Sequence, residues 1–295
     1  MGTTRLNILP VPTFSKLGVN FVERDISKYE PQELVIAPPY ENPVRADVTG
    51  STDIKLTAPE NSSVTVILYI KPDSKLMLDT FLSAAAGSRV RLVQVFEGGG
   101  QTVSRLTSEL GENASLELVQ LYLRGEDTVS EIVTKLAGRG SAFSAEIGCR
   151  LSGSDKLDLN LTAEHTGRRT ASEISLGSVL DGSAQKTFKG TIDFKNGCGG
   201  SKGSEHEDAL LMSESVKNRT VPVILCDEED VEGSHGATIG RLDEQHIFYL
   251  GSRGLSEEKI YELMSRGKLL RTINKINDGA VKQRIFDALG WEYDD

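Results

Sequence analysis

Residues Gly111–Gly140 read GENASLELVQLYLRGEDTVSEIVTKLAGRG and contain one complete unit of a pattern that fills the middle of the chain. The run Ser115–Leu118 alternates polar and apolar side chains, which places the apolar ones on one face of a β-strand. Glycine-containing turns bound the unit, Gly111-Glu112-Asn113 at one end and Gly138-Arg139-Gly140 at the other. The segment therefore predicts two short strands joined by a turn.

The same unit recurs along the chain at nearly constant spacing. Gly111 and Gly138 are 27 residues apart, Gly140 and Gly167 are again 27 apart, and Gly167 and Gly197 are 30 apart. A unit of this size cannot bury its own apolar face, whereas stacked copies bury a continuous core. We therefore expect a β-solenoid over residues 45–240, in which each coil pairs with the next. A β-sandwich is the alternative, since short strands at regular spacing also suit that architecture.

The two ends of the chain differ from the repeat. Residues 1–44 contain six prolines, which break helices and predict an irregular N-terminal arm with one strand at Glu33–Ala37. From Ser256 onward the apolar residues recur at helical spacing, with Ser256 as an N-cap and Gly290 as a stop signal. Residues 241–295 are therefore expected to form a C-terminal helical region.

Charge, cysteine content and apolar runs exclude several classes of protein. The 295 residues carry a net charge of −10, which gives no electrostatic support for binding nucleic acid. Three cysteines without a C-x-x-C pair argue against a disulfide framework and favour a reducing, cytoplasmic setting. No apolar run approaches the roughly 20 residues that a membrane-spanning helix needs. The glycine-rich run around Cys198 lacks the spacing of a nucleotide-binding loop, so any use of ATP falls to a partner.

The segment Gly203–Gly254 carries a long, particular pattern. Its part from Ser234 to Gly254, SHGATIGRLDEQHIFYLGSRG, together with VPVILCDEEDVEG before it, resembles the C-terminal core of the SufB/SufD family of iron–sulfur cluster assembly scaffold proteins. The resemblance fades upstream of about Ile192. It implies a right-handed parallel β-helix that serves as a non-catalytic scaffold for a transient iron–sulfur cluster. It also implies an ABC-type ATPase, SufC, bound through the C-terminal helices.

Four residues are candidates for the cluster site. Because a solenoid stacks residues one coil apart, Cys226, His235 and the carboxylates Glu205 and Glu207 are expected to converge on one rim. Thiolate suits iron–sulfur clusters and imidazole can replace it as a ligand, so we expect Cys226, His235 and Glu207 as ligands, with Glu205 as a substitute. A cysteine at a strand end is, however, often a small core residue, and a single histidine is more often a surface residue.

The chain also departs from the family pattern. In SufB-type members a cysteine stands at the position that matches Glu207, and a glutamate follows the histidine at the position that matches Gly236. This chain has neither, so at Gly236 it is similar to SufD. Its short length and Cys226 differ from ordinary SufD, however, so the chain resembles the short, single scaffold in which one SufB/D-type protein serves both roles. In that case Cys226 and Glu207 supply ligands that longer members place elsewhere.

The remaining histidines and cysteines receive other interpretations. His206 and His246 are expected to be structural or solvent-facing, and His165 falls in a turn and is expected to face solvent. Cys149 is expected to fill the core of a strand. Cys198 lies in a glycine-rich turn that we expect to be exposed, and it is the next thiol to consider after Cys226.

The sequence also predicts how the chain pairs with a second copy, and it leaves two alternative functions open. The apolar runs Ala209–Met212 and Val221–Cys226 lie near the end of the stack, and exposed strand edges pair readily with another chain, so a homodimer through the β-helix is expected. A carbohydrate-active β-helix enzyme is an alternative, although such enzymes use aromatic platforms and this chain has one tryptophan. A metal-free structural adaptor is a second alternative.

Overall fold

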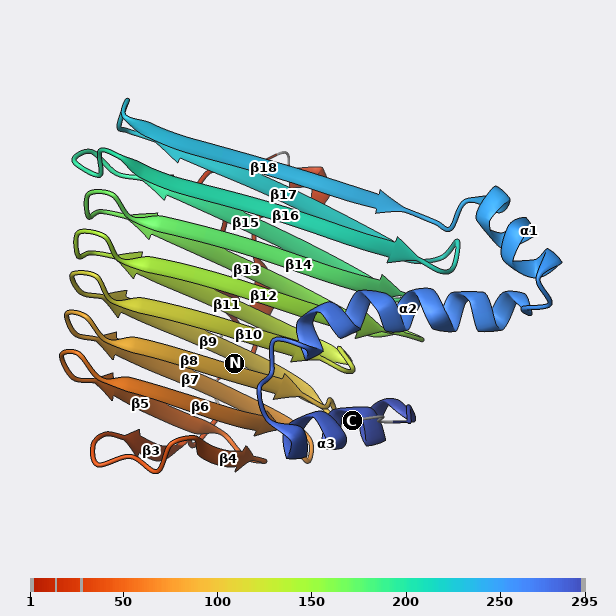
Figure 1. Ribbon diagram of the computed structural model, residues 1–295, viewed down its shortest axis with the longest axis horizontal. Helices are drawn as coiled ribbons and strands as arrows, with labels where there is room; N and C mark the ends of the chain where they lie inside the picture. Colours follow the sequence, from red (N-terminus) through yellow and green to blue (C-terminus); the bar gives the residue numbers. More distant parts are fainter. Residues whose placement is uncertain (1–2, 14, 27–28, 293–295) are drawn as a thin grey trace.

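The computed structural model is a parallel β-helix and describes residues 3–13, 15–26 and 29–292 (Figure 1). Two eight-stranded parallel sheets face one another. One sheet stacks β4 (Val44–Val48), β6 (Ser63–Ile70), β8 (Arg89–Phe96), β10 (Ser115–Tyr122), β12 (Ala142–Leu151), β14 (Ala171–Leu180), β16 (Ser201–Leu211) and β18 (Val231–Gly240). The other stacks β3 (Gln32–Ile36), β5 (Thr52–Ala58), β7 (Lys75–Ala84), β9 (Gln101–Leu110), β11 (Asp127–Leu136), β13 (Lys156–His165), β15 (Gln185–Phe194) and β17 (Lys217–Cys226).

The strand register confirms the solenoid. Arg89 pairs in parallel with Ser115 and Ser115 with Ala142, so successive coils are offset by 26 and 27 residues. Parallel pairing of each coil with the next excludes a sandwich of two antiparallel sheets. The first coil begins at Gln32, inside the segment expected as the arm.

Period-two alternation builds the core between the sheets. In β10, Leu116 and Leu118 are 1% and 0% exposed and face the lumen. Glu117 between them faces outward, where it accepts a hydrogen bond from Arg91 Nη2 of the neighbouring strand at 2.7 Å. Each coil alone would leave its apolar face in water, so the stack is the smallest unit that buries it.

The turns between the sheets repeat as closely as the strands. Asn113 and Gly140 occupy the same left-handed position in successive turns, with φ of 53° and 70°. A Cβ on Gly138 would lie 2.0 Å from Glu112 N of the turn below, so only glycine allows the turns to stack at this distance. This explains why the glycines recur with the coil period.

Three helices follow the solenoid, as expected: α1 (Glu244–Ser252), α2 (Glu257–Ile273) and α3 (Gly279–Leu289). The Ser256 side chain caps α2 by accepting a hydrogen bond from Lys259 N, and Gly290 ends α3 in the left-handed conformation with φ of 68°. Of the helices in the described part of the chain, none combines the length and the apolar character that crossing a membrane requires.

The helices cover part of the even-numbered sheet, and part of the helical region does not pack on the sheet. Buried residues of α3 and the second half of α2 pack on the outer face of the lower even-numbered strands: Leu269, Ile273, Ile285, Phe286 and Leu289 on Ile67, Val93, Val119 and Leu121. Gly148 permits this approach, since a Cβ there would lie 2.9 Å from Thr272 Oγ1. The first half of α2 and α1 extend beyond the sheet (Figure 1).

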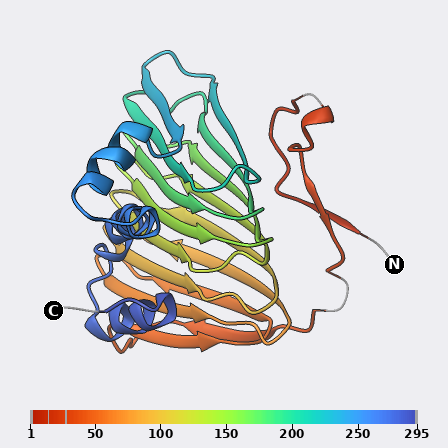
Figure 2. The same cartoon turned by 90° about the vertical axis from the view of Figure 1, so that its right-hand side faces the viewer.

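The N-terminal arm lies on the outer side of the odd-numbered sheet (Figure 2). It consists of an antiparallel pair, β1 (Thr4–Leu6) and β2 (Val22–Arg24), and a 3-10 turn, η1 (Ser15–Leu17). Leu6 packs on Val103 and Val129 of the sheet. The Asn7 amide donates to the carbonyl oxygen atoms of Ser130 at 3.1 Å and Asp158 at 2.9 Å, which fixes the arm in place.

Candidate functional site

The last two coils hold the sequence-predicted site residues, and no described strand stacks on the last one. Glu205 of β16 pairs with His235 of β18, and Glu207 pairs with Ala237. Glu205 and Glu207 are buried in the lumen, whereas His206 between them is exposed on the outer face. By this register His235 belongs to the column that faces the lumen at its open end.

Cys226 also belongs to a lumen-facing column, because it pairs with the fully buried Phe194 one coil below. Cys226 is nevertheless exposed, since no strand in the described part of the chain stacks on the last coil. Its thiol donates a weak hydrogen bond to the Glu228 carbonyl oxygen at 3.1 Å. It is therefore a free, accessible thiol at the mouth of the lumen rather than a small core residue.

His235 and Cys226 lie at different places along the last coil. Cys226 ends β17, and Val231 begins β18 after the intervening turn. His235 follows Val231 by four residues, which at about 3.3 Å per residue puts it roughly 13 Å along the strand from that turn. Within one chain, therefore, the imidazole and the thiol do not lie side by side.

Glu207 is engaged in a buried ion pair across the lumen. Its Oε1 accepts from Lys186 Nζ, both side chains are 0% exposed, and its Oε2 accepts from the Thr220 hydroxyl. Lys186 also donates to Ser178 Oγ at 2.7 Å. Releasing Glu207 to bind a metal would leave a buried lysine without its partner, which is costly. Glu207 therefore has a structural role in joining the two sheets, and it can serve as a ligand only if this ion pair is broken.

Glu205 is the less constrained carboxyl group. It is 5% exposed and receives no hydrogen bond from the described residues. A Cβ on Gly190 would lie 1.8 Å from Glu205 Oε2, so the glycine leaves the space that this carboxyl group occupies. Burial, followed by the negative charge of Glu207, raises the pKa of Glu205 from 4.5 to about 7. Directly beside His235 in the ladder, Glu205 can hold a proton or a cation near neutral pH.

The single chain therefore presents donors around an open mouth rather than a formed metal site. Within residues 3–13, 15–26 and 29–292 no three His, Cys, Asp or Glu side chains are grouped closely enough to hold a metal ion. The structure brings His235 and Glu205 together, keeps Glu207 paired with Lys186, and places Cys226 at the end of the coil. A complete ligand set requires further donors.

The expectation for His165 is wrong. His165 ends β13 and is 0% exposed, and its ring nitrogens contact Thr170 Oγ1 at 2.6 Å and Ser172 Oγ at 2.8 Å. The ring also packs on Phe194, with centroids 4.8 Å apart. Burial lowers the pKa of His165 from 6.5 to about 4, so the ring is neutral in the fold at physiological pH.

The two remaining cysteines are both buried. Cys149 is 0% exposed, as expected for a core residue, and burial raises the pKa of its thiol to about 11. Cys198, expected in an exposed turn, is also 0% exposed, because the turn folds its side chain into the core. His206 faces solvent beside Gly236, and the side chain of His246 lies outside the described residues. Among the three cysteines, Cys226 alone is exposed.

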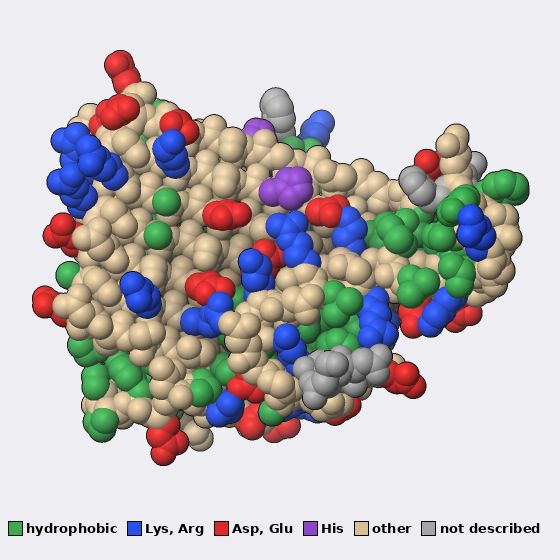
Figure 3. Space-filling model, viewed as in Figure 1, with side chains coloured by type: hydrophobic (Ala, Val, Ile, Leu, Met, Phe, Trp, Pro, Cys, Tyr) green, Lys and Arg blue, Asp and Glu red, His purple; other side chains and the backbone are tan. Residues whose placement is uncertain are grey.

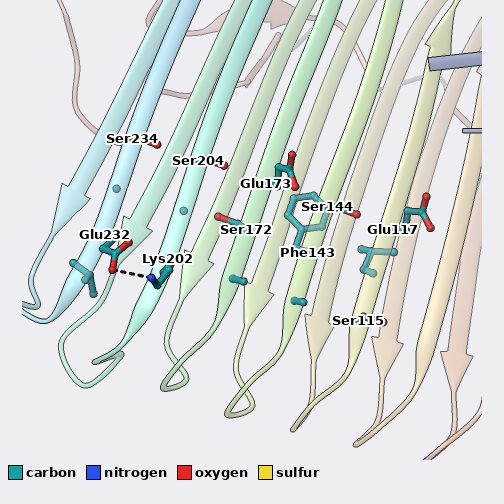
Figure 4. Close-up of a pocket in the computed structure, with 16 residues that line it drawn as sticks. Ser115, Glu117, Phe143, Ser144, Ser172, Glu173, Lys202, Ser204, Glu232 and Ser234 are labelled. Carbon is teal, nitrogen blue, oxygen red and sulfur yellow. Dashed lines mark ion pairs between the residues drawn. The ribbon is translucent and has the colours of Figure 1, made fainter. Parts of the chain in front are cut away.

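A shallow trough of about 920 Å³ lies elsewhere, along the starts of five even-numbered strands (Figure 4). One cross-strand row supplies its polar side chains: Glu117, Ser144, Glu173, Ser204 and Ser234. Lys202 and Glu232 form an ion pair at its end, with Nζ and Oε1 2.8 Å apart. The trough contains none of the candidate ligands, and Phe143 is its one aromatic side chain, so it lacks the aromatic platforms of a carbohydrate site.

Sequence reasoning missed two residues of the site, Lys186 and Gly190. Lys186 is an even-numbered residue of β15, like the buried Phe188, Ile192 and Phe194. Period-two alternation therefore predicts that its charged side chain lies in the lumen. That signal predicts a buried partner, which is Glu207. Gly190 carries no such signal, because the need for space appears only when Glu205 is seen opposite it.

Comparison with curated proteins gives partial matches. A segment of 125 residues, 42% of this chain and 29% of the relative, is 28% identical to the iron–sulfur cluster assembly protein SufD of Bacillus subtilis. An iron–sulfur cluster assembly SufBD family protein of Mycobacterium leprae is 34% identical over 103 residues, 35% of this chain and 12% of that one. SufD of Escherichia coli is 26% identical over 113 residues, 38% of this chain and 27% of the relative.

The matched segments thus span less than a third of the length of these relatives. A family model covers more of the chain. The model for the SUF system FeS cluster assembly SufBD core domain matches residues 45–268, which include nearly the whole solenoid and the first part of α2. With this match over most of its length, and with the parallel β-helix and the SHGAT segment in its last coil, the chain belongs to the SufBD family.

Proposed function

We propose that this chain is a scaffold for iron–sulfur cluster assembly in a SUF-type system, without catalytic activity of its own and working in the cytoplasm. The observation that carries the proposal is the open end of the solenoid. Its uncapped last coil presents an exposed thiol at Cys226 and an exposed imidazole at His235, and the coil below holds the buried, unpaired carboxyl group of Glu205. Soft thiolate and imidazole are ligands of iron–sulfur clusters. The cluster is cargo here, held until it passes to another protein.

A second copy of the chain would complete the ligand set. The hydrogen bonds from Lys217 N to Ala184 O and from Asp227 N to Phe194 O show that odd-numbered amides of β17 point to β15. Amides of a parallel strand alternate between its two sides, so those of Ile224 and Cys226 point to the free edge. Pro222 lacks such an amide and so fits an edge position. Antiparallel pairing of these edges about a two-fold axis would give a homodimer.

The position of the axis decides which donors meet. If β17 and β18 overlap their copies along their full length, the axis passes near the middle of each strand. His235 is the fifth of the ten residues of β18, so two copies of His235 would meet at the axis, each with Glu205 one strand further away. Cys226, at the end of β17, would lie on either side. A shifted overlap would instead bring Cys226 of one chain toward His235 of the other.

The ATPase contact is proposed on the part of the helical region that the solenoid leaves free. The expectation assigned it to the helices from Ser256 to Leu289, but α3 and the second half of α2 are covered by the sheet. Exposed apolar side chains gather instead over α1 and the first half of α2 (Figure 3): Phe248 79%, Tyr249 53%, Leu263 45% and Met264 40% exposed. Such a patch is typical of a docking surface.

Exchange of Phe248 tests this assignment. Phe248→Asp should weaken co-purification with a SufC-like ATPase at least tenfold, because burial of an aromatic side chain stabilises a complex by roughly 1.5–3 kcal/mol. Phe81→Asp is the matched control, since Phe81 is 50% exposed on β7, away from the helices. Equal binding by the two variants would contradict the assignment.

The proposal as a whole is tested by anaerobic reconstitution of the full chain with iron and sulfide. We expect brown protein with visible absorption and with iron and sulfide bound in comparable amounts, only in fractions that contain the dimer. Colourless protein that binds neither element would contradict the scaffold role and favour the metal-free adaptor. Retained binding of the ATPase by that protein would confirm that it is folded.

A further inference from the structure

The N-terminal arm (residues 3–26) turns apolar side chains toward solvent. Ile8 is 57% exposed, Val11 50%, Leu17 52% and Phe21 37%. A segment that only covered the odd-numbered sheet would bury such residues against it. Their exposure shows that the arm presents an apolar outer side.

On its inner side the arm combines the apolar contact of Leu6 with polar contacts that fix its place on the sheet. Lys189 is 0% exposed beneath it and donates to the Asn7 carbonyl oxygen and to Asp158 Oδ1, both at 2.9 Å. Arg24 pairs with Asp127 on the same sheet. These contacts hold the arm in one orientation, so the outward placement of its apolar residues is a fixed property of the fold.

The tip of the arm reaches the level of the last coil. The hydrogen bond from Leu9 N to Asn20 O closes the arm, and Val11 and Leu17 lie beyond it, so they belong to the tip. Both side views place η1, which contains Leu17, at the height of β17 and β18 (Figures 1 and 2). The exposed apolar residues of the tip therefore lie beside the open end of the solenoid.

The outer face of the odd-numbered sheet changes character at this level. In β15 the outward residues are polar: Lys189, Thr191 and Asp193. The residues paired with them in β17 are Val221, Val223 and Leu225, so the last strand carries an apolar outer strip. These three side chains are partly exposed. A second apolar surface thus adjoins the free edge.

We propose that the arm tip, Val11 and Leu17, clasps a second copy of this chain by packing on its apolar outer strip, Val221, Val223 and Leu225. The inference rests on the proposed dimer. Antiparallel pairing of β17 with its own copy joins the two odd-numbered sheets edge to edge and keeps both arms on the same side of the joined sheet. Each tip then lies at the seam, where it can cross to the other chain. The clasp removes from water apolar surfaces that one chain leaves exposed.

Substitutions in the tip test the clasp in the full chain. Val11→Asp and Leu17→Asp should each raise the dimer dissociation constant about tenfold, as judged by light scattering over a dilution series, because each replaces a half-exposed apolar side chain that the dimer buries. Val35→Asp is the matched control, since Val35 is 60% exposed in the first coil. It should leave the dissociation constant unchanged.

A double-mutant cycle tests the specific contact. Leu17→Ala and Val223→Ala should each weaken the dimer, and the double variant should lose less than the sum of the two, because residues in contact are energetically coupled. Additive losses would overturn the contact, and tip variants that dimerise like the parent would overturn the clasp. A parent that is monomeric at every concentration would overturn it as well. Iron and sulfide binding, measured separately, reports on the scaffold proposal, so the two failures are distinguishable.

Discussion

The first and last coils are built on the same repeat but end the stack in opposite ways. The first coil has strands of five residues, β3 and β4, with Pro31 before them and Pro38, Pro39 and Pro43 between them. The last coil has strands of ten residues, β17 and β18, with one proline at position 222. Short strands and prolines blunt an edge, whereas long regular strands invite pairing. The comparison supports the proposed pairing surface at the C-terminal end of the solenoid.

The lumen changes along the same axis. One lumen-facing column of the even-numbered sheet reads Val66, Leu92, Leu118, Ala145 and Ile174 from the first coils upward, and then Glu205 and His235. The lower members are apolar and almost fully buried, so they form an ordinary core. In this column ionisable groups enter only in the last two coils, next to the open end of the solenoid. The proposed cluster chemistry would therefore lie where the repeat stops.

Proline substitution at the two free edges gives the largest expected difference. Ile224→Pro removes a free-edge amide next to Pro222 and should abolish the dimer, raising its dissociation constant at least a hundredfold in light scattering. Val35→Pro is the matched control. The hydrogen bond from Gln32 N to Ser51 O shows that even-numbered amides of β3 point inward, so the amide of Val35 also points to a free edge. We expect Val35→Pro to leave the dimer intact.

If the two prolines raised the dimer dissociation constant equally, the two ends of the solenoid would not differ in their role in pairing. Circular dichroism should show unchanged β signal for both variants, because neither proline removes an amide that bonds to the neighbouring strand.

Exchange of the cysteines tests the last coil as the cluster site. Cys226→Ser should lose most of the iron and sulfide bound after anaerobic reconstitution, since it removes the one exposed thiol among the three cysteines. Cys149→Ser should lose little, because Cys149 is buried in the core. His235→Ala should give a partial loss. If Cys226→Ser binds as much iron and sulfide as the parent, Cys226 is not a cluster ligand but an ordinary residue at a strand end.

Glu205 should make the stability of the open end of the solenoid depend on pH. Because its folded pKa is raised from 4.5 to about 7, ionisation of Glu205 opposes folding, and stability is lost as pH rises between these values. Glu205→Gln should therefore stabilise the chain by about 2 kcal/mol at pH 8 and by much less at pH 5. Urea unfolding of both proteins with a metal chelator present measures the difference. A gain of equal size at the two pH values would show that charge burial is not its cause.

The sequence contained enough information for the fold because the fold is local and repetitive. Alternation and recurring glycines predicted coils of the observed length, and Ser256 and Gly290 marked helix ends that the structure confirms. His165 shows where the reasoning failed. Leu159, Leu161 and Ala163 share its parity in β13, so the alternation, continued to His165, places the ring in the lumen.

The candidate site was harder to predict because it depends on contacts across the lumen. The period-two alternation predicts which face of a strand a residue occupies, but not which residue of the opposite sheet it contacts. The Lys186–Glu207 pair and the space that Gly190 leaves for Glu205 are contacts of this kind. The separation of Cys226 from His235 follows from strand length, which the sequence left open by two or more residues at each end.

The unequal ends of the solenoid also bear on how many chains can assemble. A stack of identical repeats with two open ends would add further copies at both, and growth of that kind produces filaments. Here one end is long-stranded and open, and the other is short-stranded and interrupted by Pro38, Pro39 and Pro43. Pairing of open end with open end consumes both templates, and only blunted ends then face outward. In the proposed dimer, assembly through this edge would therefore stop at two chains, which would fix the stoichiometry without any separate capping protein.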